Sequence, residues 1–268
     1  VDATGCARDV WTRDNLYFGY PNMDNHYQRC YIILDGMSRD GDIDESLCDK
    51  IYVPSEAVKN RYNWTKPVTI VPHGVRYLFG PKDTFEIPFM YIAGFAPRKH
   101  PPGSEYVVSK LGKNIIVYTT SFNPWYADYT VEKVNLSSPY YPENTKAYTF
   151  TRFQLHQLYR KSKFYLSLSG GGAFELTPLE AMASGTPPIT LDVKPFNEYN
   201  RCGLKFRSTG VIRTPGTDTF LYDPLEVLEI ANYAMSMGKE EYYDMSSKCV
   251  EIAKQYYYLK VYPSLFKP

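Results

Sequence analysis

The chain has 268 residues and a formal net charge of +1. This length permits one large or two unequal α/β domains with a sizeable core. Because lysine and arginine form no stripe and the charge is nearly balanced, the composition argues against nucleic acid as the main partner. We therefore expect a small-molecule substrate.

The cysteine pattern and the absence of long apolar runs limit the class of protein further. No apolar run approaches the roughly 18 residues of a membrane helix, and the first residues lack the pattern of a secretory signal. The five cysteines are odd in number, widely spaced and free of any CxxC pair. They indicate neither a disulfide framework nor a zinc site, and we expect reduced thiols in the core.

Short apolar runs alternate with helical patterns, as in a parallel sheet flanked by helices. Near the N-terminus the pattern predicts strands at 30–34, 50–53 and 68–71. Ser55 is placed to cap a short helix that ends at about residue 62. Residues 79–87 mix glycine, proline and charges without periodicity, so they are predicted to form a linker.

The alternation restarts after the linker and gives a second, larger block. Its predicted strands are 89–93, 114–119, 147–150, 164–168 and 188–191. Its predicted helices are 105–111, 153–161, 176–183, 224–237 and 240–257. We therefore expect a small or truncated α/β unit over residues 1–82 and a complete one from residue 83 onward.

The most informative segment lies between the strand at 164–168 and the helix at 176–183. This segment, residues 169–175 and here called the glycine turn, contains three consecutive glycines. Such a turn presents backbone N–H groups at the carboxyl edge of a sheet, and glycine lets a phosphate or sugar approach closely. The helix dipole favours negative charge there. The turn is a candidate anion site, and a flexible loop or tight crossover is the alternative.

Two glutamates follow the glycines. Glu175 and Glu180 are five residues apart, so they do not share a helical face. Glu180 is suited to accept hydrogen bonds from the vicinal hydroxyls of a ribose, and a solvated helix residue is the alternative. A glycosidase would also use two carboxylates, but their separation cannot be read from sequence spacing.

The residues from Phe174 to Ile189, FELTPLEAMASGTPPI, resemble the donor-binding signature of the family 4 (group 1) glycosyltransferases of GT-B fold, usually EGFGLPxxEAMAxGxPVI. Supporting matches are VPS at 53–55, IVPHGV at 70–75 and a strand with basic residues at 91–99. The resemblance implies an α/β fold of GT-B type, with two Rossmann-like units that have parallel sheets. It also implies that the N-terminal, acceptor-side unit is reduced or truncated.

The domain organisation that follows has three parts. The acceptor-side unit is expected over 1–82 and the donor-binding unit over 83–239. The C-terminal helix over 240–268 is expected to cross back to the N-terminal unit. A cytoplasmic location is expected, in the host cytoplasm if the chain is viral, and peripheral membrane contact is left open.

The implied activity is a hexosyltransferase type of reaction. The enzyme would move a sugar from a nucleoside-diphosphate sugar to a sugar, lipid or protein acceptor, with retention, without metal and without any cofactor. Glu180 matches the glutamate that holds the donor ribose, and Arg98 and Lys99 match the basic residues that grip the diphosphate. Thr149 lies in the segment that matches the wall where the base stacks. The remaining donor-binding candidates are Gly171, Gly172, Ala173, Phe174, Leu176 and Thr177.

The chemistry of the reaction supports the basic pair independently of the resemblance. Negative charge accumulates on the leaving diphosphate when the glycosidic C–O bond breaks, and a fixed cation stabilises that charge directly. Arg98 and Lys99, here called the basic corner, are followed by His100-Pro101-Pro102, which predicts a non-helical turn after a strand. An ordinary exposed basic turn is the alternative.

The sequence departs from the family signature at two places. The first signature glutamate falls on Gly172, so the sugar-facing carboxylate is either missing or supplied by Glu175, which makes Glu175 the third catalytic candidate. The arginine expected after the strand glycine is Phe95. A non-catalytic module that binds a nucleotide or sugar nucleotide is therefore the alternative function.

Other motifs were weighed as sites. Asp40-Gly41-Asp42 has the DxD spacing by which another glycosyltransferase fold holds a metal ion, and acidic residues that cap a helix are the alternative. His73 lies at the predicted seam between the units and is a candidate inter-domain residue. A dinucleotide oxidoreductase would need GxGxxG, and a serine hydrolase would need GxSxG around Ser169; neither is present.

Overall fold

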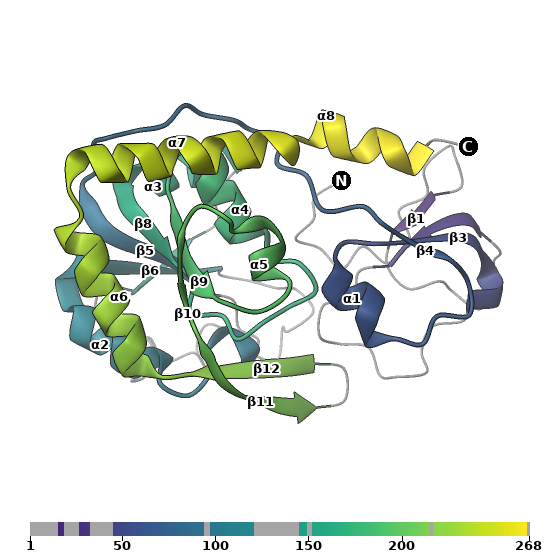
Figure 1. The fold of residues 1–268 in the computed structure, drawn as a ribbon, viewed down its shortest axis with the longest axis horizontal. Coiled ribbons are helices and arrows are strands. Elements are labelled where there is room, and N and C mark those ends of the chain that lie inside the picture. The colour runs from purple at the N-terminus through teal and green to yellow at the C-terminus, as the bar shows by residue number, and fades with distance from the viewer. Residues whose placement is uncertain are drawn as a thin grey trace.

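The structure is a computed structural model, and it describes residues 16–18, 27–32, 45–93, 97–120, 145–148, 152–214 and 217–266. Two parallel sheets lie side by side, each in its own unit (Figure 1). The first has the order β1-β2-β3-β4, with strands Leu16–Phe18, Tyr27–Tyr31, Cys48–Val53 and Val68–Ile70.

The second sheet has six strands in the order β10-β9-β8-β5-β6-β7. In chain order these are β5 (Ile87–Ala93), β6 (Ile115–Thr120), β7 (Thr145–Tyr148), β8 (Ser162–Leu166), β9 (Pro188–Leu191) and β10 (Leu204–Phe206). All of their pairings are parallel. Every residue of β8 and β9 is buried, as expected for central parallel strands with both faces covered.

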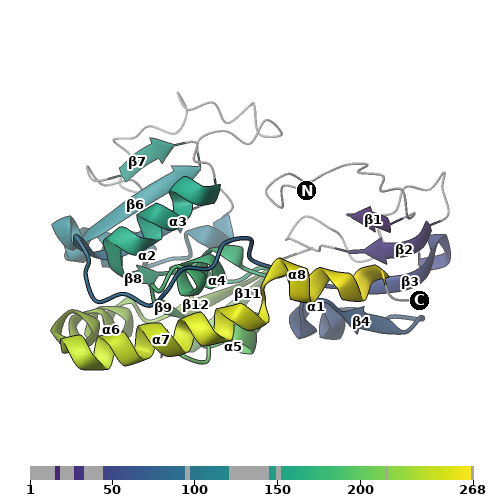
Figure 2. The same cartoon turned by 90° about the horizontal axis from the view of Figure 1, so that it is seen from above.

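Helices cover both sheets. They are α1 (Glu56–Arg61), α2 (Ser104–Leu111), α3 (Arg152–Lys161), α4 (Leu176–Ala183), α5 (Phe196–Tyr199), α6 (Pro224–Ser236), α7 (Lys239–Gln255) and α8 (Tyr258–Val261). Short 3-10 helices lie at Glu45–Leu47, Pro97–Lys99, Gly112–Asn114 and Tyr262–Phe266. Figure 2 shows α7 along the second unit and α8 along the first.

The chain crosses between the units twice, and the two crossings pair with each other. The N–H of Val75 donates to the carbonyl of Tyr256 at 2.8 Å, and the N–H of Tyr258 donates back to Val75 at 3.0 Å. After the second crossing, Val261 and Leu265 pack against the first unit's Tyr31. The C-terminal segment thus contributes to the core of the N-terminal unit.

An antiparallel hairpin extends from the second unit and was not predicted. Its strands are β11 (Ser208–Thr214) and β12 (Thr217–Tyr222). In Figure 1 it runs beneath the second sheet toward the first unit, where Arg61 and Asp218 approach to 4.0 Å. The sequence signal that would have indicated it is the Pro215-Gly216 pair between two runs rich in β-branched and aromatic residues.

The cysteines correct one expectation. Cys30 is bonded to Cys48, and Cys202 is bonded to Cys249, with Cα–Cα distances of 5.8 and 5.2 Å. The expectation of reduced core thiols is therefore wrong for these four residues. Cys30 and Cys48 lie on the neighbouring strands β2 and β3, and this proximity arises from the topology of the sheet, which cysteine spacing does not reveal.

Among the helices of the described residues, none has the length and apolar character needed to cross a membrane. The predicted domain boundaries at residues 82 and 239 stay predictions.

Candidate functional site

The site is built where two neighbouring strands of the second sheet end. Strands β5 and β8 are parallel partners, so the segments that follow them emerge at the same edge of the sheet. The 3-10 helix Pro97–Lys99 follows β5 and carries the basic corner. The glycine turn follows β8 and ends at Glu175, the N-cap position of α4. The topology thereby brings together segments about 75 residues apart in the sequence.

Arg98, Lys99 and Glu175 form a cluster of charges. Nη1 of Arg98 lies 3.3 Å from Oε1 of Glu175, and Nζ of Lys99 pairs with Oε2. Arg98 and Glu175 are buried, whereas the Lys99 side chain is 16% exposed. Two cations and one carboxylate leave a net charge of +1, which is suited to bind an anion that arrives from solvent.

The glycine turn packs tightly against neighbouring backbone. The N–H of Gly170 donates to the carbonyl of Arg98 at 2.7 Å, and its carbonyl accepts from the N–H of Phe220 in β12 at 2.7 Å. A Cβ atom on Gly170 would lie 2.6 Å from the carbonyl oxygen of Phe220. The amide of Gly170 is therefore occupied by protein, and glycine is needed there for close approach of β12.

This contact gives a testable stability prediction. Gly170→Ala lowers the free energy of unfolding by about 1–3 kcal/mol, because the backbone of β12 must shift to admit the methyl group. Gly210→Ala is the matched control, since a Cβ there meets nothing within 4 Å. Chemical denaturation measures both variants. Equal stability of the two would show that the turn does not pack on β12.

The rest of the turn lies at the seam between the units. The Phe174 ring lies between the rings of His73 and Tyr199, with centroid distances of 5.3 and 5.1 Å. His73 is buried, and its Nδ1 is 3.3 Å from the Tyr31 hydroxyl. The structure thus brings the candidate inter-domain histidine into contact with a candidate donor-binding residue.

Tyr199 fixes the end of the turn. Burial, and then the negative charge of Glu175, raises the pKa of Tyr199 well above its usual value. The hydroxyl therefore stays protonated and donates to the carbonyl of Glu175 at 2.8 Å. Two residues further along the chain, Thr177 in α4 accepts a hydrogen bond from the Tyr165 hydroxyl at 2.9 Å. Hydrogen bonds from the hydroxyls of Tyr199 and Tyr165 thus fix the start of α4, which contains Leu176 and Thr177.

Glu180 lies inside α4 and is buried at 5% exposure. Its Oε2 lies 3.4 Å from the Tyr159 hydroxyl, so the solvated helix alternative is wrong. A carboxylate offers about four hydrogen-bond acceptor sites in all.

A cavity of about 400 Å³ lies between the units on the side of α1 and α5. Its lining residues are Pro54, Glu56, Ile70, Pro72, Phe174, Lys194, Asn197, Glu198 and Tyr256. They come from both units, and the residues after β3, β4, β8 and β9 are among them. Arg98, Lys99, Glu175 and Glu180 are not among its lining residues, so this cavity does not coincide with the charged cluster.

Residues 140–242 match the family model described as "Glycosyl transferases group 1". The matched range contains β8, the glycine turn, α4 and β9. Among solved structures, HepE of Anabaena in complex with UDP and glucose is 13% identical, with a TM-score of 0.64 and coverage of 89% of this chain and 70% of that one. The fold is GT-B. Together these matches support the group 1 glycosyltransferase superfamily, and the family 4 subdivision stays a prediction.

One further GT-B neighbour and one viral relative match parts of this chain. Sucrose-phosphate synthase from Thermosynechococcus elongatus has a TM-score of 0.63 at 16% identity, covering 89% of this chain and 67% of that one. ORF313 of Acidianus filamentous virus 1 (isolate United States/Yellowstone), named as a candidate glycosyltransferase, is 38% identical over 128 residues. That alignment covers 46% of this chain and 41% of the viral protein, so it spans less than half of this relative.

Several predicted positions lie outside the described residues of this GT-B fold. They are Thr149, Phe95 and the DxD segment at Asp40-Gly41-Asp42. Within the described residues, no group of three or more histidine, cysteine, aspartate or glutamate side chains is arranged to hold a metal ion.

Sequence reasoning missed two residues at the seam between the GT-B units. Ser55 was predicted only as a helix cap, yet its hydroxyl also contacts the glycine turn. Glu198 was not considered, yet its carboxylate contacts the first turn of α1 in the other unit. Neither contact has a local sequence signal, because each joins residues more than 100 positions apart.

Proposed function

We propose that the protein is a glycosyltransferase that moves a hexose-type sugar from a nucleoside-diphosphate sugar to an acceptor hydroxyl. The convergence of Arg98, Lys99 and Glu175 at the start of α4 carries this proposal. The family match over 140–242 and the structural neighbour with bound UDP and glucose support it. We take the acceptor to be a sugar, lipid or protein.

The mechanism follows from the positions of the charges. The diphosphate lies at the basic corner, near the N-terminal end of α4, where the helix dipole adds positive potential. When the bond between the anomeric carbon and the phosphate oxygen breaks, its electron pair stays on the diphosphate. Arg98 and Lys99 stabilise that charge more strongly in the transition state than in the ground state. These cations supply the positive charge, and we propose a metal-independent, retaining reaction.

Glu180 holds the donor ribose in this proposal. Glu180→Ala should weaken donor binding by about 1–3 kcal/mol, because the ribose hydroxyls lose a charged acceptor. Calorimetric titration of a nucleoside-diphosphate sugar measures the loss, and the affinity for inorganic pyrophosphate, which has no ribose, should not change. Glu229→Ala, on the exposed face of α6, is the matched control. Equal affinity of the wild type for ribose and 2′,3′-dideoxy donors would refute this role of Glu180.

A binding module without turnover is the second candidate, because the first signature glutamate is replaced by Gly172. The two candidates differ in one measurable respect. A transferase releases nucleoside diphosphate from the donor when an acceptor is present, and a module binds the donor and releases it intact.

A further inference from the structure

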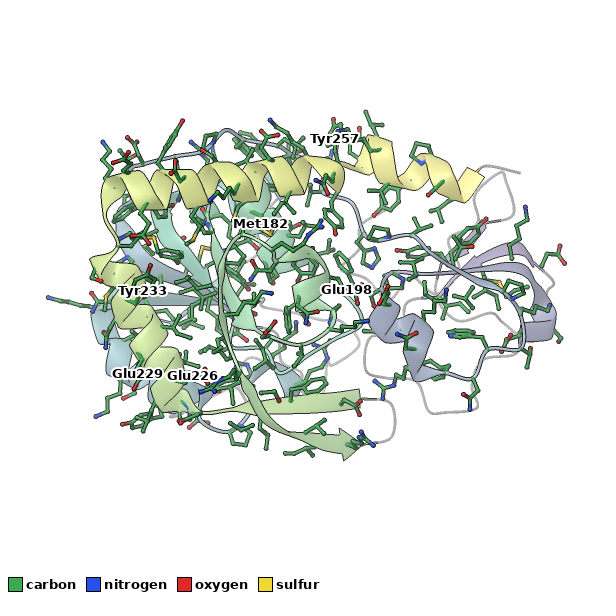
Figure 3. The ribbon with its side chains drawn as sticks, in the orientation of Figure 1. Met182, Glu198, Glu226, Glu229, Tyr233 and Tyr257 are labelled. Carbon is green, nitrogen blue, oxygen red and sulfur yellow. A yellow bond between two sulfur atoms is a disulfide. The ribbon has the colours of Figure 1, made fainter. Side chains whose placement is uncertain are left out.

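The first turn of α1 is capped partly by the other unit. The N–H groups of Glu56 and Ala57 donate to Oε2 and Oε1 of Glu198, at 3.0 and 3.1 Å. The N–H of Val58 donates to the Ser55 hydroxyl at 3.2 Å. Figure 3 shows Glu198 on the side of the second unit that faces α1. Two of these helix-end donors, the N–H groups of Glu56 and Ala57, therefore have these protein partners only while the two units are in contact.

The Ser55 hydroxyl also makes a second hydrogen bond, in which it donates to the glycine turn. Its hydroxyl donates to the carbonyl of Ala173 at 2.6 Å, and Ser55 is fully buried. The side chain of Ala173 packs in the core of the first unit together with Val53 and Val58. Ala173 of the glycine turn is thus inserted into the first unit, and the hydrogen bond from the Ser55 hydroxyl fixes its position there.

The position of Ala173 is coupled to the charged cluster of Arg98, Lys99 and Glu175 through the backbone of the glycine turn. Ala173 lies two residues after Gly171, whose carbonyl accepts from Nη1 of Arg98 at 3.3 Å. It lies two residues before Glu175, which pairs with both cations of the basic corner. A displacement of the Ala173 carbonyl therefore moves segments that contact both cations.

We propose that Ser55 is a positioning residue that fixes the glycine turn against the first unit, so that the donor site is complete only when the two units are docked. Ser55 acts through Ala173 and does not touch the reacting atoms. This inference rests on the proposed transferase function and deepens it, because it assigns part of the donor site to the acceptor-side unit. The competing role for Ser55 is that of a simple helix cap.

Hydrogen–deuterium exchange of the full chain separates the two roles without any need for activity. In Ser55→Ala, we expect loss of protection over residues 171–176 as well as in α1. Ser55→Thr keeps the hydroxyl and should restore protection at both places. Ser236→Ala is the matched control, since that exposed serine donates to the carbonyl of Tyr233 at the end of α6. Loss of protection confined to α1 would overturn the proposal.

Steady-state kinetics give the second readout. Ser55→Ala should lower kcat by between about 10-fold and 100-fold, because small misplacements of a catalytic constellation have effects of this size. Ser55→Thr should recover most of the loss, and a wild-type kcat in Ser55→Ala would contradict the positioning role. If the wild type itself shows no turnover with any donor, the transferase proposal fails, and the exchange experiment still decides the role of Ser55.

Discussion

Lys99→Ala is expected to lower kcat by between about 10²- and 10³-fold, the usual effect of removing one fixed donor to transition-state charge. Lys99 is the cation of the basic corner that reaches solvent, with 16% of its side chain exposed. Its ammonium can therefore meet a diphosphate that enters from outside. The rate is measured at saturating donor, so that a change in donor affinity does not mask the change in kcat.

Two further variants make this test specific. Lys99→Arg keeps a cation at the same place and should retain more activity than the alanine variant, although the geometry of its donors differs. Lys113→Ala removes an exposed lysine that follows α2 and should have wild-type rates. If Lys99→Ala has a wild-type kcat, Lys99 has no part in stabilising the leaving group.

Glu175→Ala has the largest expected effect on stability. Without its carboxylate, Arg98 and Lys99 lose the ion-pair partner that they share in a largely buried place. Removal of one partner from a buried ion pair lowers the free energy of unfolding by about 3–5 kcal/mol. Partial exposure of Lys99 places the expected value at the lower end of this range. Chemical denaturation of the unliganded protein measures it.

An anion should offset the loss in the Glu175 variant. Inorganic pyrophosphate can take the place of the missing carboxylate between the two cations, so it should stabilise Glu175→Ala more than the wild type. Glu226→Ala is the control, because it removes the partner of the exposed Arg207, and surface pairs contribute about 0–1 kcal/mol. If pyrophosphate stabilises all three proteins equally, Glu175 does not occupy the anion site.

The sequence predicts the central elements of the donor-side unit well. The helix at 176–183 and the strand at 188–191 agree with α4 and β9 at both ends. Their boundaries are set locally, since glycine and proline interrupt the apolar pattern on either side. The convergence of Arg98, Lys99 and Glu175 follows from strand order, because segments after neighbouring parallel strands share one edge of the sheet.

Tertiary pairing accounts for the features that the sequence did not predict. The disulfide between Cys30 and Cys48 requires knowledge that β2 and β3 are neighbours. The two backbone hydrogen bonds of Gly170 require knowledge that Arg98 and β12 lie against the turn, and β12 belongs to a hairpin that the sequence pattern did not predict. The contacts of Ser55 and Glu198 cross between the units. The pattern of residue types along the chain predicts where helices and strands lie, but it does not show which of them pack against one another.

In the proposed transferase, an activated sugar's diphosphate binds at the basic corner beside the start of α4. Thermal unfolding of the wild type and of Lys99→Ala, each with a UDP-, a GDP- and an ADP-sugar, tests it most directly. We expect at least one donor to raise the Tm of the wild type in a saturable manner, with a much smaller rise in Lys99→Ala. No rise with any of the three donors, or an equal rise in both proteins, would contradict it.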